Sequence, residues 1–114
     1  MKDFYTKWEV NGKEYTLAWN LNVMEEMQDK YGSLEAWGKI SEGEEPKISS
    51  IIDAFEAMIN EGIEIDNEKN GTNEKPLTHR QIGRIISAYG VENAAETMKN
   101  AISEATKDDT RKNA

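Results

Sequence analysis

One acidic stretch in the middle of the chain has residue types whose spacing could bind a cation. Asp66, Glu68 and Asn70 alternate along the chain and are followed by Gly71, which is the opening pattern of an EF-hand calcium loop. Such a loop needs a bidentate glutamate at its twelfth position, where this chain has Leu77. We therefore predict a polar loop with a turn at its Asn-Gly pair rather than a calcium site.

The single histidine, His79, is the other residue whose chemistry could serve catalysis. It stands beside Arg80 in a polar stretch at an expected helix start, and the chain has no cysteine. Nucleophilic catalysis needs a nucleophile, a base and an orienting group. Pairs of acids that could act as acid and base, such as Glu25 with Glu26, fall on an expected solvent face. We predict a solvent-facing histidine, no catalytic, cofactor-binding or metal-ligating residues, and a protein that is not an enzyme.

The composition narrows the classes of partner. The 114 residues carry a net charge of −8, with 22 acidic and 14 basic side chains. Phosphate backbones are bound by clustered lysines and arginines, so nucleic acid is not an expected partner, and anionic membrane surfaces are disfavoured for the same reason. The chain has no apolar run of transmembrane or signal-peptide type. The expected location is the cytoplasm.

Any site must be positioned by the secondary structure, and the first expected elements are two strands. They are segments of alternating apolar and polar residues joined by Asn11-Gly12, the preferred pair for a type I′ hairpin turn. A two-residue turn places Trp8 opposite Tyr15 and two further pairs on the same, mainly apolar face: Thr6 with Leu17, and Phe4 with Trp19. A hairpin alone is marginally stable and has two unpaired edges. We expect copies of the chain to associate through this apolar face or these edges.

Helical spacing of apolar residues predicts the rest of the chain as helices. The expected class is α+β: an N-terminal two-stranded antiparallel β-hairpin followed by four to five α-helices, in one domain over residues 1–106. Residues 107–114 are predicted to form a polar, disordered tail. The expected helices are Asn22–Tyr31, Leu34–Ile40, Ile48–Gly62, a helix that Thr78 caps and Gly90 ends, and Val91–Ala105, with a mobile loop over Ile63–Pro76.

Three segments resemble the tail assembly chaperones of long-tailed phages and prophages. They are NGKEYTL at 11–17, MEEMQDKYGSLE at 24–35 and LTHRQIGRII at 77–86. Members of that family begin with a short strand pair around an NGKEY-like phrase, followed by a helix that ends in Y/F-G-S and a later LT-started helix. The similarity spans about residues 8–90, and the asparagine-rich segment 66–75 stands where a shorter link is expected.

The resemblance implies a non-enzymatic protein in the cytoplasm of a bacterial host. Its implied partner is the tape-measure protein, which it would keep soluble by binding apolar helical segments in a groove. Surplus apolar surface would then serve binding, and adaptable methionines suit such a surface. The candidate partner-binding residues are Trp8, Tyr15, Met24, Met27, Trp37, Ile85 and Tyr89. The alternative for each is ordinary core packing.

Two other functions stay open. The first is another structural component of a phage tail or neck, of the tail-completion or head–tail connector type. The second is an acidic inhibitor that mimics nucleic acid and binds a host nucleic-acid-binding protein. The acidic residues are interspersed with 14 basic ones and form no duplex-like stripe, which ranks this reading lowest.

Overall fold

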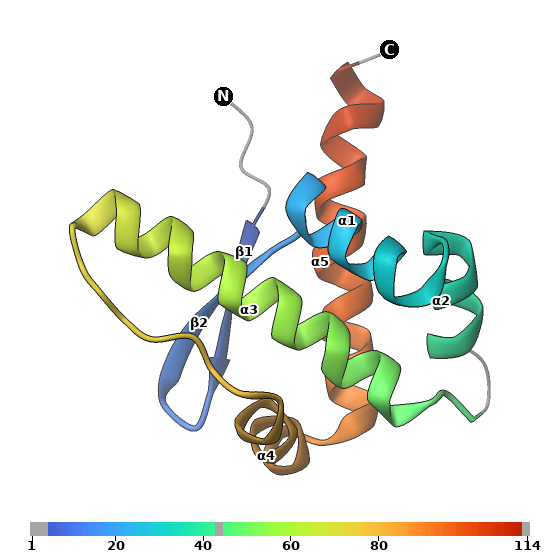
Figure 1. Cartoon of the computed structure of the whole chain (residues 1–114), viewed down its shortest axis with the longest axis horizontal. Helices are drawn as coiled ribbons and strands as arrows, with labels where there is room; N and C mark the ends of the chain where they lie inside the picture. The colour runs from blue at the N-terminus through green and yellow to red at the C-terminus, as the bar shows by residue number, and fades with distance from the viewer. Residues whose placement is uncertain (1–4, 43–44, 113–114) are drawn as a thin grey trace.

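The chain folds into a two-stranded antiparallel hairpin followed by five helices (Figure 1). The computed structural model describes residues 5–42 and 45–112, with side chains described as far as residue 106. The α+β class and the N-terminal hairpin are therefore confirmed. The elements are β1 (Tyr5–Val10), β2 (Lys13–Ala18), α1 (Leu21–Tyr31), α2 (Leu34–Ser41), α3 (Ile48–Asn70), α4 (His79–Tyr89) and α5 (Val91–Lys112).

The hairpin has the predicted turn and register. Asn11 and Gly12 have φ of 52° and 80°, the positive values that a type I′ turn requires. Trp8 pairs with Tyr15, and Thr6 pairs with Leu17, as expected. Phe4, expected opposite Trp19, lies outside the described residues.

The apolar face of the hairpin is covered by the protein's own helices. Trp8 is 4% exposed and Leu17 is fully buried. The Trp8 ring lies 4.7 Å from that of Phe55 on α3 and edge-on to that of Tyr89 on α4, at 5.1 Å between centroids. Most of this face is therefore covered within one copy of the chain, although Tyr15 is only half-buried.

Helix α3 also covers the outer edge of β2. In a hairpin of this register, the backbone N–H and C=O of Thr16 point away from β1. A Cβ on Gly62 of α3 would lie 2.0 Å from the Thr16 carbonyl oxygen, so only a hydrogen fits between helix and strand. The Thr16 hydroxyl donates to Asp66 Oδ2 at 2.7 Å and accepts from Lys7 Nζ at 2.8 Å. This part of the β2 edge is therefore not available for the expected association between copies.

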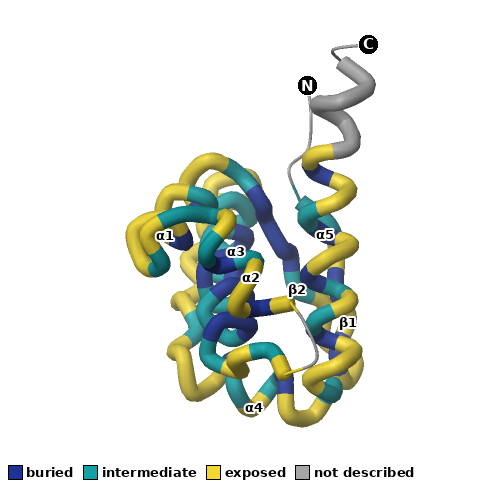
Figure 2. Tube along the Cα trace, turned by 90° about the vertical axis from the view of Figure 1, so that its right-hand side faces the viewer, coloured by how far each residue is buried: buried dark blue, intermediate teal, exposed yellow. Residues whose placement is uncertain are grey.

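Helix α3 is the centre of the fold. In Figure 1 it crosses in front of the hairpin and α5, with α4 below it and α1 and α2 on its other side. Ile51, Phe55, Met58 and Ile59 are all fully buried in it. Figure 2 shows buried residues gathered in the interior between the hairpin, α3 and α5, while the outward sides of the peripheral helices are exposed.

The predicted end of this helix at Gly62 is wrong. The helix continues to Asn70 and ends at Gly71, whose left-handed conformation (φ 65°) caps it. Gly62 is a contact residue against β2 and not a stop signal. The helix therefore includes Asp66, Glu68 and Asn70, so these residues do not form a calcium-binding loop.

Two asparagines of α3 hold the segment that follows it, which corrects the mobile loop predicted for Ile63–Pro76. Asn67 donates to the carbonyl of Glu74 and accepts from both the Thr72 hydroxyl and the Glu74 amide. Asn60 pairs with both backbone groups of Leu77: its Nδ2 donates to the carbonyl at 3.0 Å, and its Oδ1 accepts from the amide at 2.8 Å. The segment runs antiparallel to α3 along one side of it.

The remaining helix boundaries follow the caps, except at the end of α5. Asn20 caps α1 and Ser33 caps α2, both by accepting a backbone N–H. Ile48 and Val91, the first residues of α3 and α5, are 59% and 39% exposed. Helix α5 runs to Lys112 rather than to about Ala105. The side chains of the predicted tail, 107–114, lie outside the described part. None of the described helices is long and apolar enough to cross a bilayer.

Candidate functional site: a groove between the hairpin and α4

Three of the seven predicted partner-binding residues belong to the core. Trp8, Met27 and Trp37 are 4%, 0% and 6% exposed. Trp37 stacks on Trp19 with ring centroids 5.7 Å apart, and its Nε1 donates to the Ser50 carbonyl at 3.1 Å. These side chains pack in the core and present little surface to a partner, which favours the alternative of ordinary core packing for them.

The other four are half-buried and pack against that core. Met24 lies on α1, and Tyr89 lies at the end of α4, where its ring contacts Trp8 and its hydroxyl lies 3.3 Å from that of Thr97. Tyr15 and Tyr89 both contact the Trp8 ring, and Tyr15 and Ile85 lie together in one surface hollow. This hollow is a groove between the hairpin and α4.

The groove has an apolar interior and a basic rim. It is open to solvent and has a volume of about 410 Å³. Its apolar lining comes from one buried side chain, Val10, and from the half-buried Tyr15, Leu77 and Ile85, with the exposed Ala88 at its edge. The polar lining residues are Asn11, Lys13, Gln81 and Arg84.

A second hollow continues the groove along β2. It encloses about 300 Å³ and shares Lys13, Tyr15 and Leu77 with the first. Beyond them it is lined by the last two turns of α3 and by the segment that Asn67 holds. The two hollows form one trough, which lies beside the hairpin and ends at α4.

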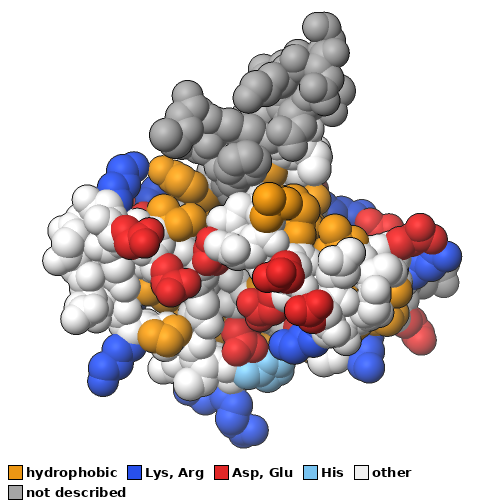
Figure 3. Space-filling model, turned by 45° about the horizontal axis from the view of Figure 1, so that its top comes forward, with side chains coloured by type: hydrophobic (Ala, Val, Ile, Leu, Met, Phe, Trp, Pro, Cys, Tyr) orange, Lys and Arg blue, Asp and Glu red, His pale blue; other side chains and the backbone are white. Residues whose placement is uncertain are grey.

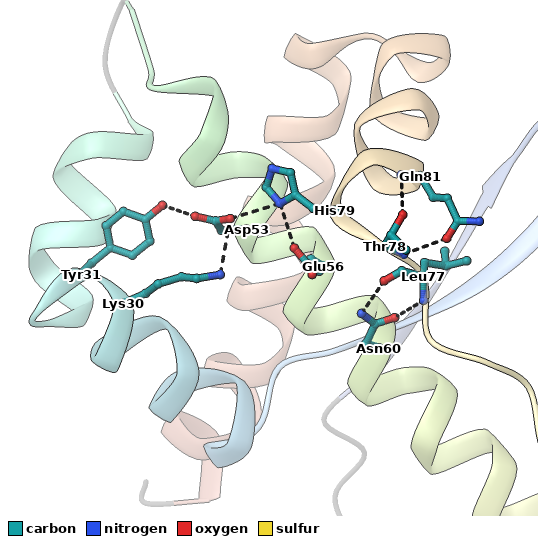
Figure 4. Close-up of polar contacts among 9 residues, drawn as sticks. All are labelled: Lys30, Tyr31, Asp53, Glu56, Asn60, Leu77, Thr78, His79 and Gln81. Atoms are coloured by element: carbon teal, nitrogen blue, oxygen red, sulfur yellow. Dashed lines mark hydrogen bonds and ion pairs between the residues drawn. The ribbon is translucent and has the colours of Figure 1, made fainter.

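Local hydrogen bonds fix the wall that α4 provides. Thr78, the cap expected from the sequence, accepts from the Gln81 amide at 3.2 Å, and the Gln81 side chain accepts from the Thr78 amide at 2.8 Å. The two bonds form a capping box. Figure 4 shows this box beside the Asn60 clamp on Leu77. Together they determine where the helix starts and hence where Ile85 and Arg84 face.

A polar cluster joins α1, α3 and α4 on the other side of α3. Asp53 accepts from the Tyr31 hydroxyl at 2.6 Å and lies 3.5 Å from both Lys30 Nζ and His79 Nδ1 (Figure 4). The same His79 nitrogen lies 2.9 Å from Glu56 Oε1. Burial and the hydrogen bond with the Asp53 carboxylate raise the pKa of Tyr31 to about 12.

The sequence did not reveal this cluster, because its members come from three helices. His79 is half exposed at the surface beside acidic side chains, as Figure 3 shows in pale blue. Ligand atoms of Asp53, Glu56 and His79 lie within 4.8 Å of one another, close enough for one cation. Lys30 and Tyr31 already occupy both oxygens of Asp53, so the cluster acts in this structure as a junction between helices.

No family model, curated protein or solved structure matches the chain. Any proposal for the function therefore rests on the groove and on the three sequence segments at 11–17, 24–35 and 77–86.

Proposed function

We propose that this chain is a tail assembly chaperone of a long-tailed phage, which binds the tape-measure protein and keeps it soluble while the tail forms. The observation that carries the proposal is the position of the resembling segments. Segment 11–17 provides Asn11, Lys13 and Tyr15 to one wall of the groove, and segment 77–86 provides Ile85 and its neighbours to the other.

The third segment, 24–35, supports the same arrangement from the far side of α3. Its Lys30 and Tyr31 contact Asp53, which also faces His79 of segment 77–86. Residues far apart in the chain that share a resemblance to one family thus converge on the groove and on the junction that positions α4. That convergence favours one common role over three coincidental local patterns.

The chemistry of the groove fits the proposed role. An apolar interior with polar residues at its rim is how proteins bind the apolar stripe of an amphipathic helix. A tape-measure protein that has not yet been enclosed by tail-tube subunits would expose such stripes. The chaperone would cover them without any covalent step.

The test is co-expression with the tape-measure protein encoded in the same gene cluster. We expect the soluble fraction of that partner to rise several-fold with this chain, and no change in solubility would refute the proposal. Ala88→Glu places a charge at the exposed edge of the groove and should remove the effect. Ser87→Glu, on the exposed neighbour that does not line the groove, is the matched control.

Mass spectrometry of purified virions separates this function from its nearest alternative. A chaperone is expected in the lysate and absent from the finished particle. A tail or neck component would be found in the particle at a fixed copy number.

A further inference from the structure

We propose that the groove selects amphipathic helical segments that carry Asp or Glu beside their apolar stripe, with those carboxylates placed against Lys13 and Arg84. This inference rests on the proposed function and deepens it, because it assigns the binding surface and the chemistry of the partner. It predicts a preference for acidic peptides, whereas the net charge of −8 would attract basic ones.

The two cations at the rim have no acidic partner among the described residues. Lys30 and Lys39 pair with Asp53 and Glu35, both away from the groove, whereas neither Lys13 nor Arg84 forms an ion pair in the described part. Lys13 Nζ lies 5.6 Å from the centroid of the Tyr15 ring, so its charge is held at the apolar wall. The first hollow is lined by these two cations and by no acidic residue, so it complements a carboxylate-bearing ligand in a chain of net charge −8. The acidic lining residues, Glu14, Asp66 and Glu74, belong to the second hollow.

The geometry favours a helix over an added strand. A peptide that extends the sheet at β2 needs the free backbone groups of that strand's outer edge. Gly62 of α3 lies directly against the Thr16 carbonyl on that edge, so no strand can pair there. The groove instead offers separate apolar side chains, Tyr15, Leu77 and Ile85, to residues spaced along one face of a helix.

The test uses two synthetic peptides of about 20 residues, long enough to become helical on binding. Both carry the same leucine stripe; one has glutamates beside it, and the other has lysines. The chain has no cysteine, so Ala88→Cys gives one labelling site at the groove edge for an environment-sensitive fluorophore. Asn100→Cys, exposed on α5, is the control label.

We expect the glutamate peptide to bind about tenfold more tightly than the lysine peptide, since each solvent-exposed pair contributes only modestly. The preference should shrink as salt is raised. Attraction to the net charge alone would give the opposite preference. Equal binding, tighter binding of the lysine peptide, or no binding would each overturn the inference.

The double substitution Lys13→Glu with Arg84→Glu should reverse the preference. Lys47→Glu with Lys99→Glu makes the same change in net charge at exposed residues outside the groove and should leave the preference intact. Thermal unfolding of each variant confirms that it is folded. A glutamate preference that survives the reversal at the groove would refute the assignment of the site.

The peptide result and the co-expression result fail separately. If the groove binds the glutamate peptide but the chain leaves the tape-measure protein insoluble, the inferred chemistry stands and the chaperone function is wrong. If the chain solubilises its partner while the peptides show no preference, the function stands and the groove is not its acid-selective surface.

Discussion

The two halves of α3 are held in place by different kinds of contact. The first half, to Ile59, presents fully buried apolar residues such as Phe55 and Met58 to the core. The second half, from Asn60, is held by one close backbone contact and by polar side chains. Gly62 packs against the Thr16 backbone, Asp66 accepts from the Thr16 hydroxyl, and Asn67 bonds to the segment after the helix. The first half builds the core, and the second half builds the floor of the trough.

The difference separates what is local in this fold from what depends on distant parts of the chain. Apolar residues at helical spacing determine the first half by themselves, because any helix there buries them together. The second half is polar and gains its partners only when the hairpin has packed against it. Substitutions in the two halves should therefore affect the protein through different mechanisms.

The largest expected effect is in the first half. Phe55→Ala removes a fully buried ring that contacts Trp8, and we expect it to lower the free energy of unfolding by about 4 kcal/mol. Urea titration followed by tryptophan fluorescence measures it. Ile48→Ala, on the same helix but 59% exposed, should cost less than about 0.5 kcal/mol, and equal losses would contradict this account of the core.

In the second half, Gly62→Ala should cost about 3 kcal/mol, because the new methyl group meets strand backbone, which cannot move aside as a side chain could. Gly38→Ala is the control: its Cβ would meet nothing within 4 Å, and alanine favours the helix by roughly 0.5–1 kcal/mol. A neutral Gly62→Ala would show that the hairpin does not pack closely on α3.

Gly62 also shows how much of the fold the sequence could predict. The hairpin turn, the capping box at Thr78 and the apolar spacing around Phe55 are local patterns, and the structure confirms each one. A glycine that ends a helix and a glycine that admits a strand look the same in sequence. Only the distant Thr16 distinguishes them.

The candidate site was predictable to the same limited degree. Aromatic residues such as Trp8 and Trp37 suit a binding surface or a core equally well, and their burial depends on the whole packing arrangement. Tyr15 and Ile85 were both on the predicted surface, but their meeting in one groove required knowledge of where α4 packs. The cluster around Asp53 left no local signal at all.

A smaller effect is expected at the clamp on Leu77. Asn60→Ala leaves both backbone groups of Leu77 without their partner and should cost about 1.5 kcal/mol. Amide hydrogen exchange should then show loss of protection at Leu77, while the capping bond at Gln81 keeps its own protection. Unchanged protection at Leu77 would mean that other contacts hold the segment.

Asn67→Ala is the comparison within the same half. Its three hydrogen bonds are exposed, so water replaces them, and alanine improves the helix propensity. We expect a net loss below about 0.5 kcal/mol. A larger loss than at Asn60 would show that Asn67, near the end of α3, contributes more than Asn60 to holding the segment after the helix.

A further small effect is expected in the first half of α3, at its polar junction with α1 and α4. The pKa of Tyr31 is raised to about 12 by burial and by the hydrogen bond to Asp53, against about 10 in an unfolded chain. Below pH 10 both states keep the phenol proton and the stabilisation is complete. Between pH 10 and 12 the unfolded state loses its proton first, so the free energy of unfolding falls.

Tyr31→Phe isolates this contribution from those of Lys30 and the other titrating groups. At neutral pH the variant should be weaker by about 0.5–1 kcal/mol, the worth of a partly exposed hydrogen bond. Its deficit should shrink between pH 10 and 12, because only the wild type loses the tyrosine term. If the two stability curves stay parallel over that range, then α1 is held to α3 by its apolar contacts alone, and the junction contributes nothing to positioning α4.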